Sequence, residues 1–167
     1  MKKLKSQAGM TLGEVLISVL ILLMLTAIVA EGIPLAQRAY YKVVDSANAQ
    51  VLLSDTLTVL RDELSMATDV EISGSTITYK SGKTGVEMTL NNSADGITMT
   101  RKGESENTII VSSGISTKQK LCVQYESPTW TNSDKEAIKL GTVKVTKTGY
   151  SGPIASLDNF TIRLMNS

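Results

Sequence analysis

Histidine is absent from this 167-residue chain, and cysteine occurs only once, at Cys122. Without histidine the chain lacks the commonest general base and the commonest metal ligand, so Ser-His-Asp catalysis, Cys-His catalysis and the usual zinc sites are excluded. A lone cysteine cannot form an internal disulfide, so packing must hold the fold together. The sequence therefore predicts a protein that is not an enzyme, with no catalytic residue, no metal site and no cofactor.

A large excess of charge is also lacking, since 17 Lys+Arg residues stand against 16 Asp+Glu residues. This balance gives no electrostatic reason to expect nucleic acid or an acidic substrate as a partner. Aromatic residues make up 4% of the chain, which argues against an aromatic-lined binding cleft. Local charge is more informative, because Lys2, Lys3 and Lys5 all lie in the first nine positions.

One long apolar run follows these lysines. Residues 10–30 contain a single charged residue, Glu14, and a helix of that length can span the roughly 30 Å of hydrocarbon in a bilayer. Basic residues before such a helix favour a cytoplasmic N-terminus and place the rest of the chain outside. The sequence thus predicts a single-pass membrane protein.

Three kinds of segment share this charge pattern: a secretory signal peptide, a plain membrane anchor and a prepilin signal. A signal peptide needs small residues at the last and third-last positions before its cleavage site, but a cut after Ala30 would put Ile28 at the third-last position. The carboxylate of Glu14 separates the other two. A charge at the start of a membrane helix is costly and normally has a partner or a function.

The segment GMTLGEVLI at residues 9–17 resembles the type IV prepilin signal, in which a basic leader ends in glycine and glutamate is fifth in the mature chain. The resemblance implies that a prepilin peptidase cuts after Gly9 and methylates the amine of Met10. It also implies that this amine pairs with Glu14 of a neighbouring subunit during assembly. Two positions depart from the family pattern, since Met10 replaces the usual Phe and Gly13 replaces a large aliphatic residue.

Gly32 and Pro34 follow the apolar run and predict a kink in the helix, because proline removes one backbone hydrogen bond and collides with the preceding turn. In the family, a bent region here lets helices pack in a filament. A simple helix boundary at this point is the alternative.

An amphipathic helix is predicted beyond Pro34, running to about Ala67. Its apolar residues, expected to face a sheet, are Tyr40, Val43, Ala47, Val51, Leu57 and Leu64. Its charged residues, expected largely on other faces, are Arg38, Lys42, Asp45 and Glu63.

Alternating patterns after residue 69 predict an antiparallel sheet. The expected strands cover residues 70–72, 76–79, 86–90, 97–100, 108–111, 121–125, 138–145 and 160–164. The fold class is therefore α+β and pilin-like, with a long N-terminal helix whose second half packs on the sheet. The predicted regions are a leader at 1–9, a transmembrane helix at 10–33, an amphipathic helix at 34–68 and a β-rich region at 69–167.

Few groups outside the N-terminus suggest chemistry. The acid pairs Asp62-Glu63 and Glu104-x-Glu106 have generic spacing and are not expected to bind metal. Cys122 is expected to face the less apolar side of its strand as an inert thiol.

Residues 126–135 carry the only tryptophan, Trp130, which either contacts a partner from an exposed loop or caps a sheet edge. Lys139, Lys144 and Lys147 could meet nucleic-acid phosphates, but a solvated face is the expected reading.

The predicted function is a structural subunit of a pilus or pseudopilus, with a minor subunit favoured over a major one. Its expected partners are the prepilin peptidase, other pilin subunits and the lipid bilayer, together with an assembly platform and motor ATPase that act indirectly. Nucleic acid is a possible partner that the sequence does not indicate. Adhesion, twitching, DNA uptake and protein secretion stay open as roles. The alternatives are an anchored extracellular binding module that never polymerises and, more remotely, a secreted β-rich enzyme.

Overall fold

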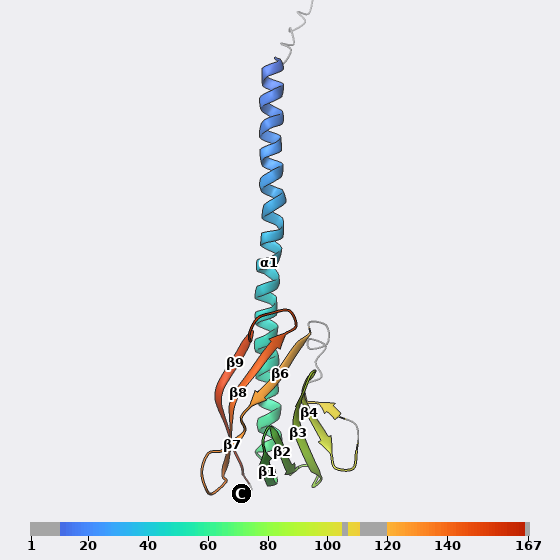
Figure 1. Ribbon diagram of the computed structural model, residues 1–167, viewed down its shortest axis with the longest axis vertical. Helices are drawn as coiled ribbons and strands as arrows, with labels where there is room; N and C mark the ends of the chain where they lie inside the picture. Colours follow the sequence, from blue (N-terminus) through green and yellow to red (C-terminus); the bar gives the residue numbers. More distant parts are fainter. Residues whose placement is uncertain (1–10, 105–106, 111–119, 166–167) are drawn as a thin grey trace, which may run out of the picture. The chain divides into compact units, whose positions relative to one another are not determined.

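The computed structural model describes residues 11–104, 107–110 and 120–165. Within these residues one long helix is followed by nine strands, all paired antiparallel (Figure 1). The elements are α1 (Leu12–Leu64), β1 (Thr68–Ser73), β2 (Thr76–Lys80), β3 (Glu87–Ser93), β4 (Gly96–Arg101), β5 (Asn107–Ile109), β6 (Leu121–Glu126), β7 (Thr129–Trp130), β8 (Ala137–Lys147) and β9 (Ala155–Arg163). This is the predicted α+β class. The chain divides into two units, Met1–Val43 and Val44–Ser167.

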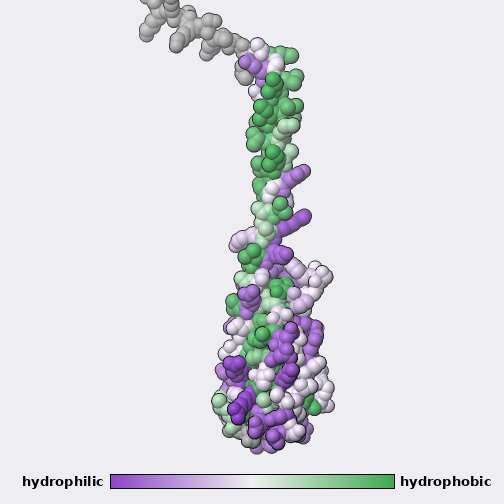
Figure 2. Space-filling model, turned by 90° about the vertical axis from the view of Figure 1, so that its left-hand side faces the viewer, coloured by the Kyte–Doolittle hydropathy of each residue, from purple (hydrophilic) through white to green (hydrophobic). Residues whose placement is uncertain are grey.

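The first unit is uncovered helix, exposed at every described residue up to Val43. Beyond its first turns the helix in Figure 2 is coated with hydrophobic residues. An 18-residue stretch of α1 is apolar enough to cross a membrane and has none of its residues buried, which is compatible with a single-pass anchor. The helix continues through Pro34, so the alternative of a helix boundary there is wrong, while the kink stays a prediction.

In the second unit the helix packs on the sheets through one narrow face. Its buried residues are Asp45, Ala49, Leu52, Thr56, Leu60 and Leu64. The spacing of three and four residues is that of one helix face. Much of the predicted stripe was therefore wrong: Tyr40, Val43 and Val51 are 66%, 68% and 48% exposed, and Ala47 is exposed as well. The prediction held at Leu64, and Leu57 packs partly against the core.

The first sheet is a meander in the order β1-β2-β3-β4-β5. Its helix-facing side chains include Ile77 and Tyr79 of β2 and Leu90 of β3, all fully buried. The expected strands at 86–90 and 97–100 left residues 91–96 as the turn between them. The turn is much shorter than expected, because β3 runs to Ser93 and β4 begins at Gly96.

The second sheet is built on β8, with β9 along one edge and both β6 and β7 on the other. The side chains of β8 that face the core change phase in the middle of the strand. In its first half the even-numbered residues Ile138 and Leu140 are buried, and in its second half the odd-numbered residues Val143 and Val145 are buried. Gly141 lies at the change, where a Cβ atom would come within 3.2 Å of the Glu126 carbonyl oxygen. The pairing with β9 stays one-to-one across this point, from Leu140 with Phe160 to Thr142 with Asp158, so the phase changes without an extra residue.

A side-chain amide joins the two sheets. Asn92 of β3 donates from Nδ2 to the carbonyl oxygen of Tyr125 in β6 at 2.7 Å, and its Oδ1 accepts from the Tyr125 backbone N–H at 3.1 Å. Gln124 adds a bond from Nε2 to the Ser93 carbonyl oxygen at 3.3 Å. The amide of Asn92 thus replaces a pair of backbone hydrogen bonds between strands. Both sheets share one hydrophobic core with the helix.

Candidate functional site

The helix begins with a reciprocal cap between Thr11 and Glu14. The Thr11 backbone N–H and hydroxyl donate to Glu14 Oε2 at 2.9 and 3.1 Å, and the Glu14 N–H donates to Thr11 Oγ1 at 3.3 Å. This is the capping-box arrangement, in which Thr and Glu three residues apart satisfy each other's backbone donors. Glu14 therefore has a hydrogen-bond partner within its own chain, which the sequence analysis did not predict.

The predicted cleavage residues, Gly9 and Met10, lie outside the described residues. Pairing of the Met10 amine with Glu14 of another subunit therefore stays a prediction. The capped carboxylate lies at the very start of the described helix, fully exposed, with the apolar run directly after it.

An apolar seam of exposed residues recurs along α1 at helical spacing. It consists of Leu22, Thr26, Val29, Ile33, Ala36, Tyr40, Val43, Ala47 and Val51. The intervals alternate between four and three residues up to Ala47, and Val51 follows four residues later. Alternation of this kind is typical of a helix that packs along another helix. Every seam residue is exposed.

Small residues shape a shallow hollow near the beginning of the seam. Its volume is about 330 Å³, and its lining residues are Leu22, Leu25, Thr26, Val29 and Ala30. The Thr26 hydroxyl donates to its own helix, to the Leu23 carbonyl oxygen at 2.8 Å, so it presents mainly its methyl group outward. A hollow between large aliphatic side chains is suited to a side chain from another helix.

A buried ion pair lies where the sheets begin to cover the helix. Asp45 is the first buried residue of α1, with 8% of its side chain exposed, and its Oδ2 accepts from Lys147 Nζ at 2.5 Å. The Tyr150 hydroxyl donates to the same oxygen at 3.2 Å, and Lys147 Nζ lies 5.4 Å from the centre of the Tyr150 ring. Asp45 was expected on a face other than the apolar stripe, and the structure places it on the face that the sheets cover, where these two partners allow the carboxylate to be buried.

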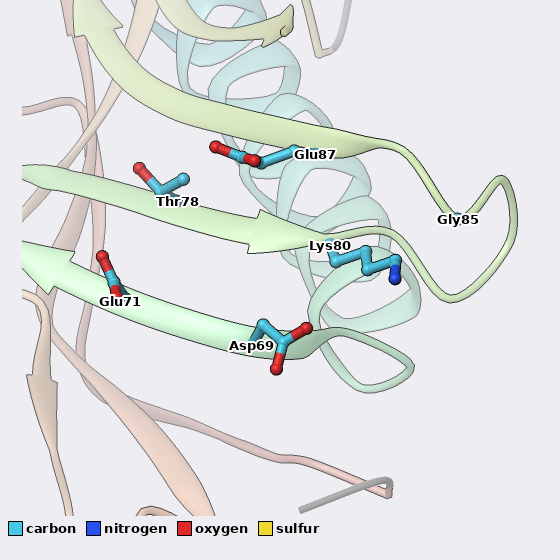
Figure 3. A pocket seen from close by; sticks show the side chains of 6 residues that line it. All are labelled: Asp69, Glu71, Thr78, Lys80, Gly85 and Glu87. Carbon is cyan, nitrogen blue, oxygen red and sulfur yellow. The ribbon is translucent and has the colours of Figure 1, made fainter.

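A polar depression of about 460 Å³ lies on the outer face of the first sheet (Figure 3). Its lining residues come from β1, β2 and β3 and from the loop between β2 and β3: Asp69, Glu71, Thr78, Lys80, Gly85 and Glu87. Lys80 lies opposite Glu87 in the register, and Glu87 binds Lys102 at 2.5 Å. Within the described ranges no group of three His, Cys, Asp or Glu side chains is arranged to hold a metal ion.

Trp130 borders a second depression, of about 270 Å³, together with Leu164 and the start of β1. The residue belongs to β7, is partly buried against the core, and has Lys135 Nζ 5.7 Å from its ring centre. Of the two interpretations of Trp130, the structure agrees with a tryptophan that packs on a sheet edge. The strand β7 itself was not predicted.

The acid pairs are occupied by neighbours. Glu63 accepts from the Ser81 hydroxyl at 2.6 Å and lies 3.3 Å from Lys83 Nζ. Glu104 lies 3.5 Å from Arg101, and Glu106 lies outside the described residues. Among the described members of the two pairs, Glu63 and Glu104 are thus engaged with neighbouring side chains.

The lysines of β8 do not form one row. Lys147 continues the inward side of Val143 and Val145 and binds Asp45, whereas Lys144 lies on the other side and binds Glu126. Lys144 and Lys147 are three residues apart, so the alternation of the strand alone puts their side chains on opposite faces, and the three lysines do not form one stripe.

Cys122 lies on the outer, less apolar side of β6, between buried Leu121 and Val123, as expected. Burial, and then the negative charge of Asp95, raises the pKa of the Cys122 thiol. The thiol is therefore poorly suited to act as a nucleophile near neutral pH.

The described residues thus include a capped carboxylate at the start of α1, an exposed apolar seam and a helix half that the sheets cover. Comparison of the chain with family models, curated proteins and solved structures finds no match.

Proposed function

We propose that this chain is a type IV pilin-like subunit, which a prepilin peptidase cleaves after Gly9 and methylates at Met10. Before assembly it lies in the cell membrane with its N-terminus in the cytoplasm and its sheets outside. It then joins other pilin subunits in a pilus or pseudopilus, with the assembly platform and motor ATPase acting on it indirectly. The proposal covers adhesive or twitching pili, competence and type II secretion alike, and favours a minor subunit.

The observation that carries the proposal is the exposed seam on α1. A plain anchor needs apolar surface only within the bilayer, over about 20 residues. The seam continues beyond that length, through Tyr40 and Val43 to Val51, and all three residues are exposed. Apolar surface outside both the membrane span and the core favours burial against other helices.

The motif at the N-terminus supports the same function independently. Gly9 and Glu14 stand at the spacing of the prepilin signal, and the carboxylate is held at the start of the apolar helix. In a dry bundle of helices an unpaired carboxylate is strongly disfavoured, so attraction to an incoming amine would set the register of neighbouring subunits.

The first test is the mass of the mature N-terminus, measured on protein from its native membrane or from sheared surface filaments. We expect a chain that begins with methylated Met10, and we expect Gly9→Leu to leave an uncut precursor. A chain that begins near Glu31, or one that retains Met1, would contradict the proposal.

Two matched substitutions separate the charge of Glu14 from its capping role. Glu14→Gln removes the charge, yet glutamine can still form a capping box. Thr11→Val keeps the charge but removes the hydroxyl of the cap. We expect Glu14→Gln to be cleaved normally but lost from purified filaments, and Thr11→Val to be incorporated. The reverse result would assign Glu14 to capping alone and remove the charge-pairing argument.

The seam is tested in the same filament assay. Val43→Glu places a charge in the seam without touching the core, so we expect normal folding and membrane insertion but at least tenfold less incorporation. Lys42→Glu is the control, because residue 42 lies on the other side of the same turn. Equal incorporation of both variants would show that the seam is not an interface.

A further inference from the structure

The cluster of Asp45, Lys147 and Tyr150 occupies a particular place in the fold. Towards the N-terminus, every described residue up to Val43 is exposed, and the hydrogen bonds of that stretch lie within the helix itself. Towards the C-terminus, Ala49 and Leu52 are buried against the sheets. Asp45 is thus the first point at which a contact outside the helix fixes α1.

The partners of Asp45 come from the distant hairpin between β8 and β9. Lys147 is the last residue of β8, and Tyr150 lies in the turn that leads to β9. Lys147 reaches the helix because the phase change near Gly141 turns the second half of β8 and carries residues 143, 145 and 147 inward. Without that change Lys147 would project from the outer face of the sheet.

The carboxylate has little freedom to leave this position. Only 8% of the Asp45 side chain and 23% of the Lys147 side chain are exposed, so separating the two charges would leave each partly buried and unpaired. Removal of one member of a buried pair lowers the stability of the fold by far more than the intact pair contributes to it, because the remaining charge keeps its desolvation cost.

We propose that this cluster is a strap, formed by Asp45, Lys147 and Tyr150, which ties the β8–β9 hairpin to α1 and sets the point from which the helix is free to unwind. Unwinding that starts in the uncovered stretch, where Pro34 already removes one backbone hydrogen bond, stops at the strap. The proposal does not depend on filament formation, because it concerns the isolated subunit.

Hydrogen exchange on the full chain in detergent micelles tests the strap. The reporting amides are those of residues 46–49, whose helical hydrogen bonds end on the carbonyl oxygens of residues 42–45. We expect Asp45→Asn to accelerate their exchange roughly 10- to 100-fold, while the amides of Leu60 and Leu140 keep their wild-type rates. Unchanged exchange at residues 46–49 would overturn the proposal.

Three further variants make the test specific. Lys144→Gln breaks the exposed pair with Glu126 on the same strand and should change nothing at residues 46–49. Tyr150→Phe removes one hydroxyl and should accelerate those amides by about threefold to tenfold. In the double variant Asp45→Asn with Lys147→Gln, the amides of residues 46–49 should exchange no faster than in the single variant with the faster exchange. If the accelerations of the two single variants multiply in the double variant, the two residues act independently and the strap is overturned.

Discussion

Tyr79 and Tyr125 are the largest side chains that the core buries completely. The Tyr125 hydroxyl donates to the carbonyl oxygens of Ser75 at 2.6 Å and Leu90 at 3.0 Å, so one side chain of the second sheet satisfies two backbone groups of the first. Burial raises the pKa of Tyr125, and burial together with the nearby charge of Glu63 raises the pKa of Tyr79.

These shifts predict loss of stability at high pH. Below about pH 10 both the folded and the unfolded chain hold the tyrosine protons. Above it the unfolded chain releases them and the folded chain does not, so the free energy of unfolding falls by about 1.4 kcal/mol per pH unit for each tyrosine. Urea unfolding at pH 9, 10 and 11 measures the slope. Tyr125→Phe should remove about half of this tyrosine contribution, and an unaltered slope would contradict the prediction.

Single residues also show where sequence reasoning succeeds and fails. Glu14 stands out because a charge beside an apolar run is rare, but its partner Thr11 was overlooked although the Thr-x-x-Glu spacing is visible in the sequence. Asp45 could not have been placed correctly from the sequence. Its partner Lys147 lies 102 residues away, and only the folded sheet brings the two together.

At the scale of elements, the second half of α1 has two faces that could each pack on the sheets. One carries Tyr40, Val43 and Val51 and is the more apolar, so periodicity favoured it as the core face. The other carries Ala49 and Thr56, small residues that allow a close approach of the sheets. Periodicity reports that a face is apolar but not what covers it, which is why the prediction chose the wrong face.

The strands were easier to predict where alternation is regular. The hairpin of β1 and β2 and the long strand β8 were expected close to their observed bounds. The two-residue β7 was missed because it is too short to show a period, and the phase change in β8 because it depends on the partners of Gly141.

The amide of Asn92 makes a testable prediction about the junction of the sheets. Asn92→Ala leaves the Tyr125 backbone N–H and carbonyl without their side-chain partner, so we expect the free energy of unfolding to fall by about 2 to 4 kcal/mol. Asn91→Ala is the control, because Asn91 binds the Thr76 hydroxyl within one sheet and should cost about 1 kcal/mol. If urea unfolding gives the same loss of free energy of unfolding for both variants, the junction contributes no more to stability than a hydrogen bond within one sheet.

At the scale of the whole molecule, the α+β class followed from the order of the segments, one long helix and then short alternating strands. The division of the strands into two sheets did not, because a side-chain amide rather than a turn or a helix marks the junction. No strand pattern in the sequence signals such a junction.

The distribution of buried residues predicts that the second unit folds without the membrane segment. Every buried residue that the structure describes lies after Val44, so a chain that begins at Glu31 keeps the described core and the strap. We expect it to unfold in a single transition, with a free energy of unfolding within about 5–15 kcal/mol, and not to float with lipid vesicles. The full chain should float with them. Aggregation or absence of a cooperative transition in the shortened chain would contradict this prediction.

The amide junction between the sheets also has a consequence for the time course of folding. Strands β1 to β5 pair only with their neighbours along the chain, so this half can form early, as contacts close in sequence generally do. The pairing of β8 with β9 forms only once β9 is present, and the hydrogen bonds of Asn92 form only once Tyr125 of β6 is in place. Until then one side of the helix stays bare, and a nascent chain in that interval exposes apolar surface to quality-control proteases and chaperones.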